Sequence, residues 1–256
     1  MSIEHHIVGS GPRTIFLTHG WFGSSDGWGP FVDYLDPDAF RWVFTDVRGY
    51  GARMGEEGDQ SLGETARDLL ALADELGVDR FTIVGHSMGG SAAQKVLALA
   101  PDRVEAIVAI TPVGSMPTPF DDEGRALFWG APEHRDNRIG IIDLLTGHRD
   151  TPRFLSTIAD WSLAHSTVAA YAGALEAWAN PDFADDVRGQ QLPVLVAVGE
   201  HDPALGAETV KETWLPLFPN ARLEVIPNAG HWPMFETPVN LATTVDAFLR
   251  GLPEPD

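Results

Sequence analysis

The fold of this chain is decided by the stretch Phe81 to Gly90, which reads Phe-Thr-Ile-Val-Gly-His-Ser-Met-Gly-Gly. Its first four residues are apolar or β-branched, which predicts a short buried strand of the parallel-sheet type. The alanine- and leucine-rich residues 91–100 that follow predict a helix. Between them, Gly85 to Gly89 fits the pattern Gly-x-Ser-x-Gly, and the strand before and the helix after are the context in which this pattern carries a nucleophile.

The predicted turn places the Ser87 hydroxyl at the end of the sheet. Such a turn is strained, and side chains at positions 85 and 89 would collide with neighbouring backbone, so glycine is needed at both. The helix that starts here points its N-terminal N–H groups at whatever Ser87 attacks. The alternative is an ordinary glycine-rich turn, which the flanking strand and helix disfavour.

The composition limits the kinds of protein that this chain can be. With 256 residues and 44% hydrophobic content, the chain can build one large α/β domain with a sizeable core. It has no cysteine, which excludes disulfides, zinc–thiolate sites and a cysteine nucleophile. The formal net charge of −20 would repel phosphate backbones and anionic membranes, so neither nucleic acid nor membrane is expected as a partner. No signal-peptide layout or membrane-length apolar run is apparent, and we expect a cytoplasmic location.

Strand and helix patterns alternate over most of the chain. This alternation predicts right-handed crossovers and a doubly wound, mostly parallel sheet. We expect strands at residues 3–8, 14–18, 41–45, 81–84, 104–110, 194–198 and 223–226, and helices at residues 28–35, 62–76, 91–100, 208–217 and 239–250. The alternation breaks between residues 113 and 189, where only helices are expected, at 139–145, 152–165 and 168–179. We therefore predict a core domain of residues 1–112 and 190–256, and an inserted helical cap of residues 113–189.

A serine hydroxyl needs a base to take its proton. His231 is the best placed histidine, because it follows the last predicted strand and so lies at the same edge of the sheet as Ser87. A capped loop histidine without a catalytic role is the alternative. His86 is adjacent to Ser87 but should point away from it, and His19 is expected to be structural. The remaining candidates, His134, His148 and His165, fall in the predicted cap and could at most line a pocket.

The base in turn needs an anion that orients it. Glu200 and Asp202 both follow the strand at 194–198, and Asp202 is favoured because it lies further into the loop. The tetrahedral intermediate needs N–H donors for its oxygen. We expect these to be the amides of Met88 and Trp21, with the Phe22 amide as the nearby alternative to Trp21.

In these motifs the chain resembles the α/β-hydrolase fold proteins of the abhydrolase type. The likeness rests on residues 19–21, 46–51, 85–90, 199–202 and 230–231, which match the family's landmarks in order. It covers nearly the whole chain apart from the predicted cap. The resemblance implies an α/β-hydrolase fold with a catalytic triad of Ser87, Asp202 and His231, and an oxyanion hole formed by the Trp21 and Met88 amides. Phe22 is a departure, since many relatives have proline there.

The predicted reaction is the hydrolysis of a carboxylic ester through an acyl-enzyme, with no metal and no organic cofactor. Serine at position 87 argues against haloalkane dehalogenases and epoxide hydrolases, which resemble this chain but use aspartate. Lactonases, carbon–carbon bond hydrolases and perhydrolases remain open as alternatives, as does a small-molecule receptor of the same fold. The expected partner is a small ester or lactone, and the oligomeric state stays open. Six residues are candidates to line the substrate pocket: Phe22, His86, Phe128, Trp129, Trp161 and Trp232.

Overall fold

A seven-stranded sheet forms the centre of the computed structural model, which describes residues 2–254. Its strands lie in the order β1-β3-β2-β4-β5-β6-β7, and only the pairing of β1 with β3 is antiparallel. The predicted doubly wound, mostly parallel sheet is therefore confirmed. The strands are β1 (His5–Val8), β2 (Arg13–Thr18), β3 (Phe40–Thr45), β4 (Phe81–His86), β5 (Val104–Ile110), β6 (Val194–Gly199) and β7 (Ala221–Ile226).

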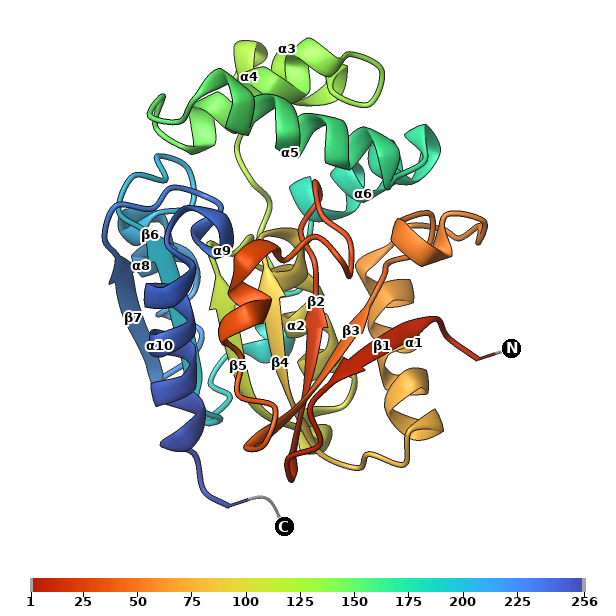
Figure 1. Cartoon of the computed structure of the whole chain (residues 1–256), viewed down its shortest axis with the longest axis vertical. Coiled ribbons are helices and arrows are strands. Elements are labelled where there is room, and N and C mark those ends of the chain that lie inside the picture. The colour runs from red at the N-terminus through yellow and green to blue at the C-terminus, as the bar shows by residue number, and fades with distance from the viewer. Residues whose placement is uncertain (1, 255–256) are drawn as a thin grey trace.

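Each face of the sheet packs against its own hydrophobic core. Along β2, Ile15 and Leu17 point into one core and Phe16 into the other, as expected when successive side chains alternate across a strand. Both cores are closed to solvent, which is why the central strands read as continuous apolar runs rather than alternating ones. Figure 1 shows α1 and α10 on opposite sides of the twisted sheet.

The helices follow the predicted pattern with some differences. The α-helices are α1 (Leu62–Glu75), α2 (Met88–Leu99), α3 (Asp122–Gly130), α4 (Arg135–Leu145), α5 (Pro152–Ala164), α6 (Val168–Ala179), α7 (Ala184–Val187), α8 (Ala207–Thr213), α9 (Pro233–Glu236) and α10 (Pro238–Arg250). The helix expected at 28–35 is a short 3-10 helix, Gly29–Tyr34, and two further 3-10 turns span Gly51–Arg53 and Pro101–Arg103. Helix α3 was not predicted; Asp121 caps it by accepting a hydrogen bond from the Gly124 amide at 2.7 Å.

Helices α3 to α6 lie between β5 and β6 in sequence, and Figure 1 shows them as a layer above the ends of the strands. Helix α7 instead shares the core formed by α1, α2 and α8, since Ala184 and Val187 are buried in it. The division into a core domain and a cap at 113–189 stays a prediction, and residues 1, 255 and 256 of that core lie outside the described part of the chain.

No helix within residues 2–254 is long and apolar enough to cross a membrane.

Candidate active site

Ser87 occupies the sharp turn between β4 and α2. Its backbone has φ 53° and ψ −117°, a conformation that side-chain-bearing residues rarely adopt. A Cβ at Gly85 would collide with the Gly89 carbonyl, and a Cβ at Gly89 would collide with the Thr18 carbonyl. The steric reason given for glycine at both positions thus holds in the structure. Helix α2 begins at Met88, three residues earlier than the sequence pattern indicated.

The imidazole of His231 is hydrogen-bonded to Asp202. The Nδ1 atom lies 2.7 Å from Asp202 Oδ2, and both side chains are buried. A carboxylate at this distance only accepts, so Nδ1 carries the proton and a neutral ring leaves Nε2 free to accept one. The other Asp202 oxygen accepts the amides of Ala204 and Leu205, which holds the carboxylate in place.

Glu200, the other acid considered, faces elsewhere. Its carboxylate accepts the Asn228 amide at 2.9 Å and lies 3.6 Å from the exposed ring of His201. The structure therefore brings Asp202, and not Glu200, to His231.

His231 reaches the neighbourhood of Ser87 through its backbone. Its carbonyl accepts hydrogen bonds from His86 Nε2 at 2.9 Å and from Thr111 Oγ1 at 3.0 Å. His86 precedes Ser87, and Thr111 follows Ile110, whose carbonyl accepts the Ser87 amide. No hydrogen bond joins Ser87 Oγ to His231 within the described residues. Catalytic hydrogen bonds in unliganded enzymes are often long and tighten only when substrate binds.

Among the backbone amides near Ser87, those of Trp21 and Met88 have no acceptor within residues 2–254, and the same holds for the Phe22 amide that is the alternative to Trp21. A Cβ at Gly20 would lie 3.1 Å from the Ser87 Cβ, so the loop that carries Trp21 packs directly against the serine. Met88 is the first residue of α2, where the helix leaves its N–H groups unpaired. Free donors next to a serine hydroxyl are what an oxyanion hole requires.

His19 lies behind this loop and holds it. Its Nδ1 donates to the Gly20 carbonyl at 2.8 Å, and its Nε2 accepts the Val47 amide at 3.1 Å. Burial lowers the pKa of His19, despite the nearby Asp46 carboxylate, and so favours the neutral ring that this pair of bonds needs. The structural role expected for His19 agrees with these contacts.

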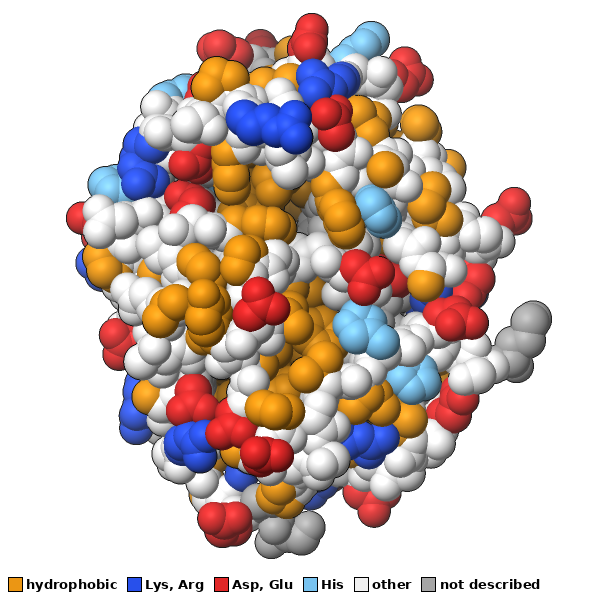
Figure 2. All heavy atoms as spheres, viewed as in Figure 1, with side chains coloured by type: hydrophobic (Ala, Val, Ile, Leu, Met, Phe, Trp, Pro, Cys, Tyr) orange, Lys and Arg blue, Asp and Glu red, His pale blue; other side chains and the backbone are white. Residues whose placement is uncertain are grey.

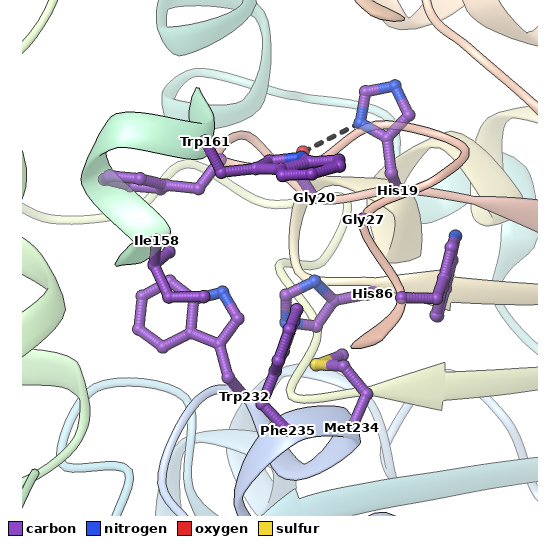
Figure 3. A pocket seen from close by; sticks show the side chains of 12 residues that line it. His19, Gly20, Gly27, His86, Ile158, Trp161, Trp232, Met234 and Phe235 are labelled. Atoms are coloured by element: carbon purple, nitrogen blue, oxygen red, sulfur yellow. Dashed lines mark hydrogen bonds between the residues drawn. The ribbon is translucent and has the colours of Figure 1, made fainter. Parts of the chain in front are cut away.

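A small cavity of about 20 Å³ opens beside His86. Four of the six residues expected in the pocket line it: Phe22, His86, Trp161 and Trp232. Figure 3 shows Trp161 at the top of the view and Met234 and Phe235 at the bottom, with His86 between them. On the molecular face in Figure 2, hydrophobic side chains gather around a hollow between the upper helices and the sheet.

Phe128 and Trp129 do not line this cavity. Phe128 is buried and its ring stacks against that of Trp21 with 6.0 Å between the ring centres. Trp129 donates its Nε1 proton to Glu176 at 2.6 Å, and the Arg125 guanidinium lies over its ring. Its contacts are with other helices of the same layer.

Two contributors to the site were missed at the sequence level. Thr111 donates to the His231 carbonyl, and Glu236 accepts the amides of Gly230 and Trp232. The only signal for Thr111 was its place at the end of β5. Glu236 stands five residues after His231 in a short helix, and no spacing rule connects the two.

The chain was compared with protein families and known proteins. Residues 15–244 match the model of the alpha/beta hydrolase family. The chain belongs to this family. The predicted resemblance is thus confirmed over residues 15–244.

The relatives carry different activities on one scaffold. A non-heme haloperoxidase of Rhodococcus erythropolis is 30% identical, with 87% of this chain and 86% of that protein covered. Esterase YbfF of Escherichia coli K12 is 26% identical, with 93% and 91% covered. Among solved structures, the esterase EaEST of Exiguobacterium antarcticum superposes with a TM-score of 0.84 at 19% identity, covering 96% and 95%. The enol-lactonase of Burkholderia xenovorans LB400 superposes with a TM-score of 0.82 at 25% identity, covering 96% of each chain.

Proposed function

We propose that this alpha/beta hydrolase is a serine carboxylesterase. The observation that carries the proposal is the buried His231–Asp202 hydrogen bond of 2.7 Å at the edge of the sheet where Ser87 sits on its strained turn. The proposal is also supported by the similarity to proteins that are named esterases. Hydroxyl, imidazole and carboxylate in this order form the arrangement that activates serine.

Acylation would begin when the substrate's carbonyl carbon reaches Ser87 Oγ. His231 Nε2 takes the hydroxyl proton as the C–O bond forms, and Asp202 stabilises the resulting imidazolium. The carbonyl oxygen becomes an oxyanion that accepts hydrogen bonds from the Trp21 and Met88 amides. His231 then gives its proton to the leaving alkoxide, which departs as an alcohol and leaves an ester on Ser87.

Deacylation would repeat these steps with water as the nucleophile. His231 takes a proton from water, the hydroxide adds to the acyl carbon, and the same amides hold the second oxyanion. Collapse breaks the bond to Ser87 Oγ, which recovers its proton from His231. The products are the acid and the free enzyme, and these steps use no group beyond those named above.

The cavity favours small acyl or alcohol groups. About 20 Å³ holds little more than one water molecule, and its walls are largely aromatic. Trp161 is one of the lining residues, so a long acyl chain that entered this cavity would meet its indole. Short-chain esters are therefore the proposed first substrates.

Hydrolysis of p-nitrophenyl acetate by wild type and Ser87→Ala tests this proposal. We expect the variant to lose a factor of about 10⁴ or more in kcat, since the nucleophile is removed while the fold is kept. A fluorophosphonate should label wild type at Ser87 and leave the variant unlabelled. Equal rates for both proteins, or no labelling of folded wild type, would contradict the proposal.

A lactone ring would open through the same intermediate, and an enol-lactonase shares the fold. A panel of short esters, lactones and vinylogous diketones, measured on the same preparation, ranks esterase against lactonase and carbon–carbon bond hydrolase activity. Addition of hydrogen peroxide to the ester assay tests perhydrolase activity, because peroxide would then compete with water for the acyl-enzyme. A protein that binds these compounds but turns over none of them would instead be a receptor.

A further inference from the structure

The carboxylate of Glu236 binds the amides on both sides of His231. One of its oxygens, Oε2, accepts the Gly230 amide at 2.7 Å, and the other, Oε1, accepts the Trp232 amide at 3.0 Å. Only 4% of the Glu236 side chain is exposed. Hydrogen bonds from amides to an ionised carboxylate are stronger than neutral ones, so this contact restrains the loop tightly.

Other contacts hold His231 itself and Ala229, two residues before it, whose carbonyl accepts the His201 amide at 2.8 Å. The His231 amide donates to the Leu145 carbonyl at 3.1 Å, and its carbonyl accepts from His86 and Thr111. None of these bonds uses the Gly230 amide or the Trp232 amide, whereas Glu236 accepts both. Rotation of the two flanking peptides would turn the imidazole away from Asp202, and Glu236 opposes that rotation.

We propose that Glu236 is a positioning residue for His231, holding the two flanking amides so that the imidazole stays aligned between Asp202 and Ser87. The inference rests on the proposed role of His231 as the base. Glu236 touches neither substrate nor the reacting atoms, so its effect passes through the geometry of the loop. Misplacement of a catalytic group by about 1 Å can cost about 100-fold in rate.

The charge around Glu236 makes this contact sensitive to pH. Burial, together with the like charge of Asp150, raises the pKa of Glu236, although the Gly230 and Trp232 amides and Arg149 act in the opposite direction. Arg149 lies 3.3 Å from Glu236 and also donates to the Asn228 carbonyl. Protonation of Glu236 removes the charge that strengthens both amide bonds. Because its pKa is raised, this weakening should begin at a pH above the usual pKa of glutamate.

The test compares Glu236→Gln and Glu236→Asp with wild type. Glutamine has a single acceptor oxygen for two amides, and aspartate is shorter by one methylene group. Rates on p-nitrophenyl acetate are divided by the number of sites that a fluorophosphonate labels at completion, which removes any loss of folded protein. Glu208→Gln is the matched control, because Glu208 is exposed on α8 and, among the described residues, its carboxylate pairs with Lys211 alone.

We expect kcat per labelled site to fall about 10- to 100-fold in Glu236→Gln with KM little changed, and to fall less in Glu236→Asp. As the pH falls, wild type should lose part of its advantage over Glu236→Gln, because protonation of Glu236 removes a charge that the glutamine variant lacks at every pH. A kcat ratio of wild type to Glu236→Gln near one at every pH, even with a lower melting temperature of the variant, would overturn the inference. Failure of the proposed function looks different, because wild type itself would then neither hydrolyse the ester nor become labelled.

Discussion

Ser87 shows how the chain stabilises an unfavourable backbone conformation. A residue other than glycine in such a region costs about 1–3 kcal/mol, and it persists only where its surroundings hold it. Here the Ser87 amide donates to the Ile110 carbonyl at 2.9 Å, and the Ser87 carbonyl accepts from Gly90 at 2.8 Å and Val113 at 3.0 Å. The Ser87 backbone is thus held by bonds to the end of β5, to the loop after it and to α2.

Asp202→Asn should lower kcat on p-nitrophenyl acetate about 10⁴-fold, because an amide in place of the carboxylate disfavours the productive tautomer of His231 and no longer stabilises the imidazolium. Glu200→Gln removes the other carboxylate of this loop and should stay near the wild-type rate, since Glu200 contacts the Asn228 amide. The measurement is the steady-state rate of wild type and of both variants at pH 7. The reverse result, with the larger loss at position 200, would exclude Asp202 as the partner of the base.

Helix α5 closes the cavity through one tryptophan. Trp161 Nε1 donates to Ser24 Oγ at 3.2 Å, and the indole stacks on His165 at 3.9 Å. A Cβ at Gly27 would lie 2.9 Å from Nε1, so the loop after β2 passes directly under the ring. Backbone bonds fix the same helix layer beside it: the His165 carbonyl accepts the Gly51 amide at 2.9 Å. These contacts therefore hold the indole of Trp161 in the wall of the cavity.

Trp161→Ala should widen the range of accepted esters. Removing the indole opens space where an acyl chain would extend, and each added methylene group in an apolar pocket is worth about 1–3 kcal/mol. We expect the ratio of kcat/KM for p-nitrophenyl octanoate over acetate to rise roughly tenfold or more. Trp161→Phe keeps an aromatic ring but loses the bond to Ser24, and it serves as the control. An unchanged ratio in Trp161→Ala would place the acyl chain elsewhere.

The whole molecule has an excess of acidic residues, with 37 acidic and 17 basic side chains. Within residues 2–254 a few charged side chains are buried, among them Asp46, Arg53 and Asp202. Arg138 is another, which is 1% exposed and bonds the neutral oxygens of Ala131, Pro132 and Ser162, with its guanidinium 3.6 Å from the Tyr171 ring centre. Burial disfavours the charged form of an ionisable group, and it lowers the pKa of His19 and of His86.

Stability should fall as the pH drops below about 6.5, the usual pKa of histidine. Burial lowers the pKa of His19, and burial together with the neighbouring His231 lowers that of His86 further. In this window the unfolded chain binds protons that the folded chain excludes, so each histidine removes about 1.4 kcal/mol of unfolding free energy per pH unit.

Urea denaturation between pH 6.5 and 5.5 measures this slope. His86→Gln should reduce it, because this variant removes the buried ring whose pKa is lowered furthest. Equal slopes in wild type and His86→Gln would mean that the buried ring accepts a proton in the folded state.

Much of the fold and part of the candidate site could be predicted because the information is local. The strand, the Gly-x-Ser-x-Gly turn and the following helix depend on sterics within about ten residues. Glycine is required at positions 85 and 89 because a Cβ at either would collide with backbone. The alternation of strands and helices then places the ends of β4, β6 and β7 at one edge of the sheet, which is why Asp202 and His231 could be named.

Other features were decided only by the packing of distant segments. Glu200 and Asp202 follow the same strand, and the direction of each carboxylate depends on the loop after β7. In sequence, Trp129 resembles the other aromatic candidates for the pocket, but its indole N–H donates a hydrogen bond to Glu176. Glu236 becomes a partner of the His231 loop through the turn into α9. Sequence determined the backbone turns because they depend on near neighbours, whereas tertiary structure decided where each side chain points because that depends on residues far away in the chain.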